Sequence, residues 1–396
     1  MTPGARVQAA IDCLDLIAAA ARESGAAADT LIARYFATRR FAGSKDRRAV
    51  RELVYAVIRA IGDCPASGRG ALIGYARAID PTLLGLFGSA PHAPPQLVAG
   101  EPESTPSLAP VWLLDELRRR FGTDTPRQAA ALLARAPLDL RVNTLRAGRD
   151  TVVIDGAEPT PFAATGLRTT LPLAVEAHPA FLAGEVEIQD EGSQLAVAAC
   201  AAAPGMIVVD LCAGAGGKTL ALAAAMANDG RIVATDTDRG RLQRQGPRLA
   251  RAGVTIVEPR LLDPGHEAAT LSDLAGAADL VVIDAPCSGT GTWRRNPEAR
   301  WRLTPTRLER LAAAQARLLA LGATLVRPGG ALVYIVCSLL PAEGEAVTEA
   351  FLKQHSNFAA EPQRNPANGA PVTALTLTPG DYGCDGFYIA RMTRPC

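Results

Sequence analysis

The feature that most constrains the fold is a regular alternation of apolar runs and helical segments from Ser193 to the C-terminus. Short apolar runs occupy residues 207–214, 231–236, 280–287, 330–338 and 385–394. Segments with helical spacing of apolar residues lie between them, at 218–227, 239–253 and 304–326. Continuous apolar strands joined by crossover helices are typical of a parallel sheet covered on both faces. We therefore expect a Rossmann-like α/β domain over residues 191–396.

The first half of the chain is organised differently. Residues 5–87 place apolar side chains at helical spacing and are rich in Ala, which predicts an all-α bundle. Residues 88–110 are dense in Pro and Gly and predict an extended linker. Two helices and three short strands (138–145, 166–171 and 184–190) should then form a small α+β module. We expect three parts: a helical domain with its linker at 1–110, the module at 111–190 and the α/β domain at 191–396.

Composition excludes several classes of protein. The 396 residues are 48% hydrophobic and carry a net charge of +1, so neither global disorder nor a uniformly basic chain is expected. No run of 18 apolar residues predicts a membrane span, and the N-terminus lacks the apolar run of a signal peptide. Eight cysteines without a CxxC pair indicate neither disulfides nor a metal site, and favour a cytoplasmic protein with free thiols.

A glycine-rich loop, residues 210–219, separates the first apolar strand from a helix. Its glycines allow the backbone to approach a ligand closely, and the helix N-terminus offers unpaired N–H groups. A P-loop would need Gly where Cys212 stands, and a dinucleotide fingerprint would need Gly where Thr219 stands. A nucleoside cofactor without a pyrophosphate, such as S-adenosylmethionine, remains. Asp236 ends the next strand, where an acid can accept hydrogen bonds from ribose hydroxyls.

Two cysteines follow two of the apolar strands. Asp284-Ala285-Pro286-Cys287 ends one strand and Cys337-Ser338 ends the next. A free cysteine is usually an inert core residue, but functional groups collect at the carboxyl ends of parallel strands. Methylation of a pyrimidine at carbon 5 needs such a pair. One thiolate adds to carbon 6 and activates carbon 5, and a second group assists breakdown of the adduct. Asp284 could hydrogen-bond the cytosine ring.

At this point the chain resembles the RsmB/Sun/Nop family of RNA 5-methylcytosine methyltransferases. The motifs that carry the resemblance are DLCAGAGGKT, ATDTD, DAPCSGTG, LVYIVCSLLPAEGE and DGFYIARM. The basic N-terminal segment is similar to the NusB-like RNA-binding domain of the RsmB branch. LDLRVNTLRAG is similar to the start of the family's small module.

The resemblance implies an S-adenosylmethionine-dependent RNA cytosine-C5 methyltransferase that acts on ribosomal RNA. It assigns Cys337 as the nucleophile and Cys287 as the group that promotes release of the product, an order that the residues alone leave open. The implied cofactor contacts are Cys212, Ala213, Gly214, Ala215, Gly216, Gly217, Lys218, Asp236, Asp263 and Asp284. Three departures stand out: Val336 replaces the family's Thr, Gln245-Gly246-Pro247 interrupts the adenine-side helix, and the linker and the strand after Arg149 are short.

RNA contacts are expected at two places. Residues 34–59 contain eight basic and two acidic residues, which suits phosphate binding, although a solvated helix face is the plainer interpretation. After the Pro-Cys loop, arginines and tryptophans could hold a strand that presents a flipped-out base. These are Arg294, Arg295, Arg300, Trp293 and Trp301. Packing of the tryptophans under the loop is the alternative.

We expect a monomer that binds RNA and needs neither a membrane nor a metal. Two other functions stay open: the same chemistry on transfer RNA, and a non-catalytic RNA-binding or ribosome-assembly factor on the same fold. The sequence names neither the target cytosine nor the state of the RNA, naked or in an assembling subunit.

Overall fold

The computed structural model describes residues 1–23 and 25–396, and the chain divides into two compact units. The first unit consists of Met1–Ala134 and Thr292–Pro305, and the second of Arg135–Gly291 and Thr306–Cys396. A segment from the second half of the sequence is thus part of the N-terminal unit. The expected division at residues 110 and 190 stays a prediction.

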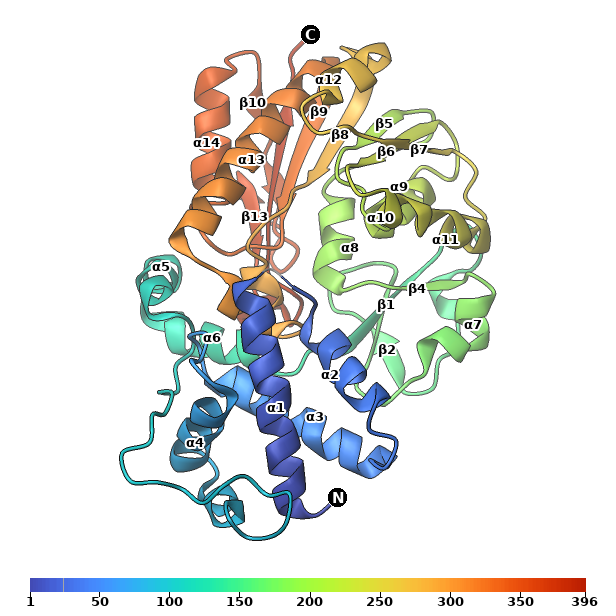
Figure 1. Ribbon diagram of the computed structural model, residues 1–396. Coiled ribbons are helices and arrows are strands. Elements are labelled where there is room, and N and C mark those ends of the chain that lie inside the picture. Colours follow the sequence, from blue (N-terminus) through green and yellow to red (C-terminus); the bar gives the residue numbers. More distant parts are fainter. Residues whose placement is uncertain (24) are drawn as a thin grey trace. The chain divides into compact units, whose positions relative to one another are not determined.

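The first unit is helical, as expected, and has its own apolar core. It begins with α1 (Pro3–Arg22), α2 (Ala28–Ala37), α3 (Ser44–Ala60) and α4 (Gly68–Ala78), shown in blue in Figure 1. Leu14, Ile58 and Leu72, from α1, α3 and α4, are fully buried in one cluster. A 3-10 helix (Pro81–Leu86) follows, and α5 (Val111–Phe121) and α6 (Thr125–Leu133) complete the helices of residues 1–134.

The expected linker at 88–110 contains no helix or strand, yet it is held to the bundle by backbone hydrogen bonds. Ser104 N–H donates to the Gly70 carbonyl at 3.0 Å, and Ser107 N–H donates to the Ala60 carbonyl at 2.9 Å. A Cβ at Gly74 would lie 1.8 Å from the Ser104 oxygen, so glycine permits this close approach.

The small module of the second unit is an antiparallel sheet with strand order β2-β3-β1-β4. The strands are β1 (Leu138–Val142), β2 (Ala157–Pro159), β3 (Gly166–Thr169) and β4 (Val186–Ile188), and a short helix α7 (Pro179–Leu182) precedes β4. The sequence predicted β1, β3 and β4 but missed β2. That strand contains a proline and lies at the sheet edge, where a missing N–H is tolerated.

The main sheet has the strand order β10-β14-β9-β8-β5-β6-β7, and β9 to β7 in this order are parallel. Its strands are β5 (Ile207–Asp210), β6 (Arg231–Asp236), β7 (Val257–Leu261), β8 (Ala278–Asp284), β9 (Val326–Val336), β10 (Ala359–Ala360) and β14 (Phe387–Thr393). Figure 1 shows these strands side by side. This confirms the predicted α/β domain.

Helices cover both faces of the main sheet. On one face, α8 (Glu191–Ala198), α9 (Gly217–Ala225) and α11 (Gln245–Ala252) bury side chains with alternate strand residues such as Val208 and Val282. On the other face, Leu271, which follows α12 (Glu267–Thr270), and residues of α13 (Pro305–Leu325) and α14 (Glu345–Gln354) share one buried cluster with Val209 and Val281. Successive side chains of a strand point to opposite faces of the sheet, so each buried strand contributes residues to both apolar cores.

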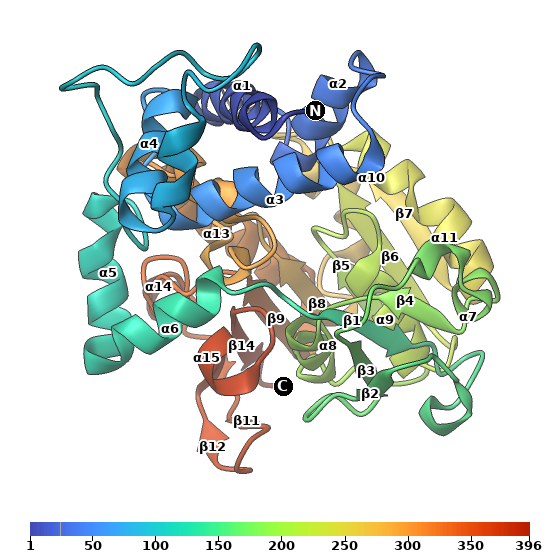
Figure 2. The same ribbon diagram turned by 90° about the horizontal axis from the view of Figure 1, so that it is seen from below.

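The last strand of the main sheet departs from the parallel direction expected from the sequence. β14 runs antiparallel to β9, with Tyr388 opposite Val336. It begins at the edge where β9 ends, so it can only run back along that strand. β13 (Ala374–Leu377) pairs antiparallel with β14, and α15 (Pro379–Tyr382) lies between these two strands in the sequence. A short ribbon of β11 (Gln363–Arg364) and β12 (Pro371–Val372) extends beyond α15 in Figure 2.

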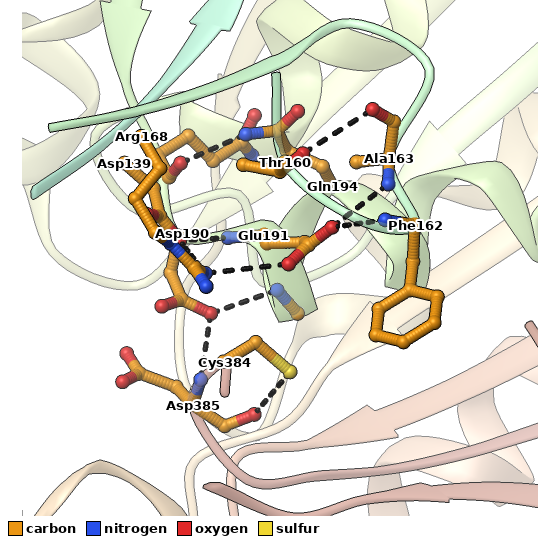
Figure 3. A network of polar contacts seen from close by, with 12 residues as sticks. Asp139, Thr160, Phe162, Ala163, Arg168, Asp190, Glu191, Gln194, Cys384 and Asp385 are labelled. Carbon is orange, nitrogen blue, oxygen red and sulfur yellow. Dashed lines mark hydrogen bonds and ion pairs between the residues drawn. The ribbon is translucent and has the colours of Figure 1, made fainter. Parts of the chain in front are cut away.

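A buried polar network joins the small module to the α/β domain within the second unit (Figure 3). Arg168 on β3 forms ion pairs with Asp139 on β1 at 2.6 Å and with Glu191 at the start of α8 at 3.3 Å. The Glu191 carboxylate also accepts the N–H groups of Phe162 and Ala163, at 2.6 and 2.9 Å. Since Asp139 and Glu191 are almost fully buried, their charges need these partners.

Candidate active site

The two cysteines predicted to react lie together at the carboxyl edge of the main sheet. β8 and β9 are adjacent and parallel, with Asp284 opposite Ile335, so the segments that follow them meet. The Cys287 and Cys337 Sγ atoms are 3.3 Å apart. Both residues are partly exposed, and each also packs against the apolar core of the α/β domain.

The electrostatic environment distinguishes the two thiols. The pKa of Cys287 is raised well above its usual value. The causes are the hydrogen bond to Cys337, the burial of Cys287, and the negative charges of Cys337 and Glu343. Cys287 therefore stays protonated and can donate its S–H to Cys337. This arrangement places a thiol that keeps its proton within hydrogen-bond distance of a second sulfur.

Lys218 and Asp284 form an ion pair at the same edge. Lys218 Nζ, from the first turn of α9, lies 2.6 Å from Asp284 Oδ2 at the end of β8. Burial lowers the pKa of Lys218, but the Asp284 carboxylate and the negative charge at Cys337 outweigh it, and the pKa is raised. The lysine is thus a fixed positive charge within the electrostatic reach of the cysteine pair.

The glycine loop has the backbone conformation that the sequence requires. Gly214 and Gly216 have φ of +55° and +84°, which favour glycine, and the second is the N-cap of α9. Gly214 N–H donates to Asp236 Oδ2 at 2.9 Å, which brings the loop to the end of β6. Ala213 N–H donates to the Thr235 carbonyl at 2.8 Å. The loop and the predicted ribose acid are therefore in direct contact.

The residues around this loop fit S-adenosylmethionine. A Cβ at Gly217 would meet open space, so the start of α9 is accessible to a ligand. Asp210 Oδ1 is buried without a hydrogen-bond partner in the described structure, although Oδ2 accepts from Thr219 at 2.7 Å. Each Asp236 oxygen accepts one backbone N–H and keeps a lone pair for a hydroxyl donor.

Three side chains that sequence reasoning missed hold the carbonyl groups of the glycine loop. Gln245 Nε2 donates to Gly214 at 2.8 Å, and Arg248 donates to Ala215 at 2.6 Å. Gln189, from the small module, donates to Gly217 at 3.3 Å. The break predicted near Gln245 is present, because α10 (Arg239–Gln243) ends just before α11 begins. The break gives Gln245 a fully buried place under the loop.

Three other residues singled out from the sequence, Cys212, Asp263 and Val336, differ in burial and position. Cys212 packs against the apolar core beneath the loop, and burial raises the pKa of its thiol, so it is not a nucleophile. Asp263 is exposed and follows Leu262, whose N–H donates to the Asp236 carbonyl at 2.9 Å. Val336, which replaces the family's Thr, is buried on the opposite face of β9 from Cys337.

A buried glutamate also missed from the sequence links the two cysteine turns. Glu343 is fully buried, and its carboxylate accepts hydrogen bonds from Ser288 and Ser338, the residues that directly follow the cysteines. Gln315 on α13 donates to the same carboxylate at 3.0 Å and to the Pro286 carbonyl at 2.9 Å. The motif LLPAEGE contains this acid, but nothing in the pattern marks it as buried.

The expectation that Trp293, Arg294, Arg300 and Trp301 contact RNA is wrong, because all four are buried. Trp301 belongs to the core of the helical unit, and its Nε1 donates to the Ile61 carbonyl at 2.8 Å. The Arg300 guanidinium donates to backbone carbonyls at the end of α3 and to Leu108. The tryptophans are packed, as the alternative expected, but Trp301 lies in the core of the helical unit and not under the Pro-Cys loop.

The basic segment of the helical unit is largely exposed. Arg34, Arg40, Lys45, Arg47, Arg48 and Arg51 are exposed, and so is Phe41 in the turn between α2 and α3. Arg39 lies over the Tyr35 ring at 3.6 Å, and Arg47 donates to the Ala42 carbonyl at 2.9 Å. Some of these cations therefore also have a structural role. No helix formed by residues 1–23 and 25–396 is long and apolar enough to cross a membrane.

Comparison with protein families agrees with this organisation. The family described as 16S rRNA methyltransferase RsmB/F matches residues 197–393. The ferredoxin-like domain of RsmF/B-like methyltransferases matches residues 109–176. The first match contains the glycine loop and both cysteines, and the second contains α5, α6 and strands β1 to β3.

Individual relatives support the same conclusion. The Synechocystis sp. protein named "Probable ribosomal RNA small subunit methyltransferase B" is 34% identical over 72% of this chain and 66% of its own length. Ribosomal RNA small subunit methyltransferase B of Thermus thermophilus is 41% identical over 54% of this chain and 51% of its own. This chain therefore spans just under two thirds of the first of these relatives and about half of the second.

Solved structures extend the likeness to the whole fold. The crystal structure of PH0851 has a TM-score of 0.76 and 25% identity and covers 99% of both chains. A methyltransferase homolog protein from Pyrococcus horikoshii has a TM-score of 0.62 and 31% identity, covering 73% of this chain and 96% of that one. From the paired cysteine turns, the glycine loop and these matches, we conclude that the chain belongs to the RsmB/F family of methyltransferases.

Proposed function

We propose that this protein methylates carbon 5 of a cytosine in small-subunit ribosomal RNA. RsmB/F methyltransferases use S-adenosylmethionine, which supplies an electrophilic methyl group when bound. The observation that carries the proposal is the 3.3 Å approach of Cys287 and Cys337 at the ends of adjacent parallel strands. Methyltransferases that act on amino nitrogens have no need of such a thiol pair.

Cys337 is proposed as the nucleophile. Its thiolate adds to carbon 6 of the ring, and the electron pair moves to carbon 5, which then takes the methyl group. A base removes the carbon 5 proton, and the returning electron pair expels the Cys337 thiolate. Lys218 interacts electrostatically with Cys337, and this nearby positive charge supports Cys337 in this role.

Cys287 is proposed to assist release of the product. It keeps its proton in the free protein and lies in hydrogen-bond contact with the Cys337 sulfur. It can therefore donate a hydrogen bond to the thiolate as the carbon–sulfur bond breaks. A donated hydrogen bond stabilises the negative charge that develops on the leaving sulfur.

The loop from Cys212 to Lys218 and the acids Asp236, Asp263 and Asp284 are proposed to hold the methyl donor. The Asp236 carboxylate would bind the ribose hydroxyls, and the start of α9 would approach the methionine part. The exposed cations of α2, α3 and their connecting turn are proposed to bind RNA phosphates. A free nucleophilic thiol is chemically suited to the reducing cytoplasm, where we propose that the protein acts.

Trapping the covalent RNA adduct tests this function. Cys287→Ala should accumulate a protein–RNA adduct resistant to denaturant, and Cys337→Ala should form none. Cys384→Ala, at a buried cysteine outside the pair, serves as the matched control and should behave as the parent. Small-subunit ribosomal RNA and transfer RNA are offered in parallel to identify the substrate. An adduct that persists in Cys337→Ala, or the absence of methylation and adduct with both RNAs, would contradict the proposal.

A further inference from the structure

We propose that Glu343 is a positioning residue that holds the Cys287 and Cys337 turns together. This inference rests on the proposed function, because it assigns a role to a residue that touches neither the RNA base nor the methyl donor. The turns follow two different strands, and Gly291 N–H donates to the Cys337 carbonyl at 3.0 Å. Side chains must supply the rest of the connection.

The Glu343 carboxylate bridges the residue after each cysteine. Oε1 accepts Ser288 N–H at 2.8 Å and Gln315 Nε2 at 3.0 Å. Oε2 accepts the hydroxyl groups of Ser288 and Ser338, the latter at 2.5 Å. Both oxygens thus receive two donors each, which satisfies a carboxylate that has no exposure to solvent.

Glu343 is itself held in place, so the bridge is rigid. Tyr334, inside β9, donates its hydroxyl to the Glu343 carbonyl at 2.7 Å. The hydroxyl groups of Ser338 and Thr290 are 3.1 Å apart, and Thr290 Oγ1 accepts Leu339 N–H at 2.9 Å. A closed network of this kind fixes the side chains that it contains. The separation of the two sulfur atoms is therefore set by the serines and not by contact between the thiols alone.

Two substitutions separate the bridge from the charge. In Glu343→Gln, the amide oxygen can accept the two N–H donors while its NH₂ group donates to the two serine hydroxyls, which reorient. The bridge is kept and the charge is lost. Glu343→Ala removes both. Ser338→Ala removes one connection and serves if Glu343→Ala fails to fold. Glu349→Gln, at an exposed position of α14, is the control for loss of a carboxylate.

Two readouts are measured on the full chain. The first is methylation, with kcat and the KM for S-adenosylmethionine determined separately. The second is independent of activity: diamide takes one hydrogen from each thiol, becomes the hydrazine and leaves a Cys287–Cys337 disulfide, whose rate of formation is followed by peptide mass mapping. A residue with only a general structural role would alter the melting temperature but would not change this rate in the folded protein.

We expect Glu343→Ala to lower kcat about 100-fold and to slow disulfide formation about tenfold, with the KM for the donor unchanged. Glu343→Gln should stay within about fivefold of the parent in both, and Ser338→Ala should lie between. The proposal would be overturned if folded Glu343→Ala had normal kcat and a normal rate of disulfide formation. If Glu343→Ala does not fold, the same result in Ser338→Ala would overturn it. Equal losses in Glu343→Gln and Glu343→Ala would also overturn it. Failure of the proposed function is distinct, because the parent would then methylate neither RNA and Cys287→Ala would accumulate no RNA adduct.

Discussion

Lys218 Nζ lies 2.6 Å from Asp284 Oδ2, and this ion pair connects the cofactor loop to the strand that leads to the cysteine pair. The contact joins two residues that are 66 positions apart in the sequence. Because the carboxylate keeps the lysine protonated, a positive charge is fixed where a thiolate must form. The loop proposed to bind the methyl donor therefore also brings a positive charge near Cys337, the proposed nucleophile.

Replacing this lysine should slow the chemistry of Cys337. In Lys218→Met, we expect alkylation of Cys337 by iodoacetamide at pH 8 to slow about tenfold, because the charge that favours the thiolate is gone. The rate is measured by mass spectrometry of the peptide that contains Cys337. Lys353→Met, at an exposed position of α14, is the control and should react as the parent. Equal rates in Lys218→Met and the parent would show that the lysine does not act on the thiol.

The buried carboxyl of Asp210 should make stability depend on pH. Burial raises its pKa from 3.8 to about 7. Between these values the folded state keeps a proton that the unfolded state has lost, so the free energy of unfolding falls as pH rises and is level above pH 7. When the pH rises from 5 to 8, the free energy of unfolding of the parent should fall by on the order of 3 kcal/mol relative to that of Asp210→Asn. Urea unfolding without cofactor at both pH values measures this. A difference that does not change with pH would contradict the assignment.

Arg300 should be essential to the helical unit. Its fully buried guanidinium donates to several backbone carbonyls, and burial lowers its pKa to about 9. Arg300→Ala leaves those carbonyls without a donor, and we expect it to destabilise the helical unit by about 3 kcal/mol or more. Thermal unfolding monitored by circular dichroism measures the loss. Arg310→Ala, at an exposed arginine of α13, should have almost no effect. A small effect of Arg300→Ala would mean that water replaces the guanidinium.

RNA affinity should depend on the exposed cations of the helical unit. Arg39 and Arg47 also have structural contacts, so the exposed Arg40, Lys45 and Arg48 are the cleaner choice for charge reversal. Their replacement by Glu should weaken RNA binding and reduce the slope of log Kd against log salt by about 2. Fluorescence anisotropy at several salt concentrations measures the slope. An unchanged slope would place the RNA elsewhere.

The architecture was accessible from sequence because hydrophobic patterning is local information. The alternation of apolar strands and helices predicted the main sheet, and the helical spacing near the N-terminus predicted the bundle. The antiparallel direction of β14 and the existence of β2 were not accessible, since each depends on where a neighbouring strand lies. A short apolar run has the same pattern in either direction.

Some residues of the candidate site could also be predicted from the sequence, and others could not. The glycine loop, Asp236 and the two cysteines are visible because they stand at strand ends, where a sheet of this kind collects functional groups. The predicted roles of Arg300 and Trp301 were wrong because arginine and tryptophan suit RNA and a helix-bundle core equally well. Only their burial distinguishes the two.

The amino-acid sequence by itself determined the main alternation of strands and helices, the glycine loop and the two cysteines at strand ends. The tertiary structure decided which side chains meet. It placed Cys287 against Cys337, Lys218 against Asp284, and Glu343 beneath both cysteine turns. The physical reason is range: patterning acts over a few neighbouring residues, whereas hydrogen bonds and ion pairs between distant residues exist only after the sheet has brought its strand ends together.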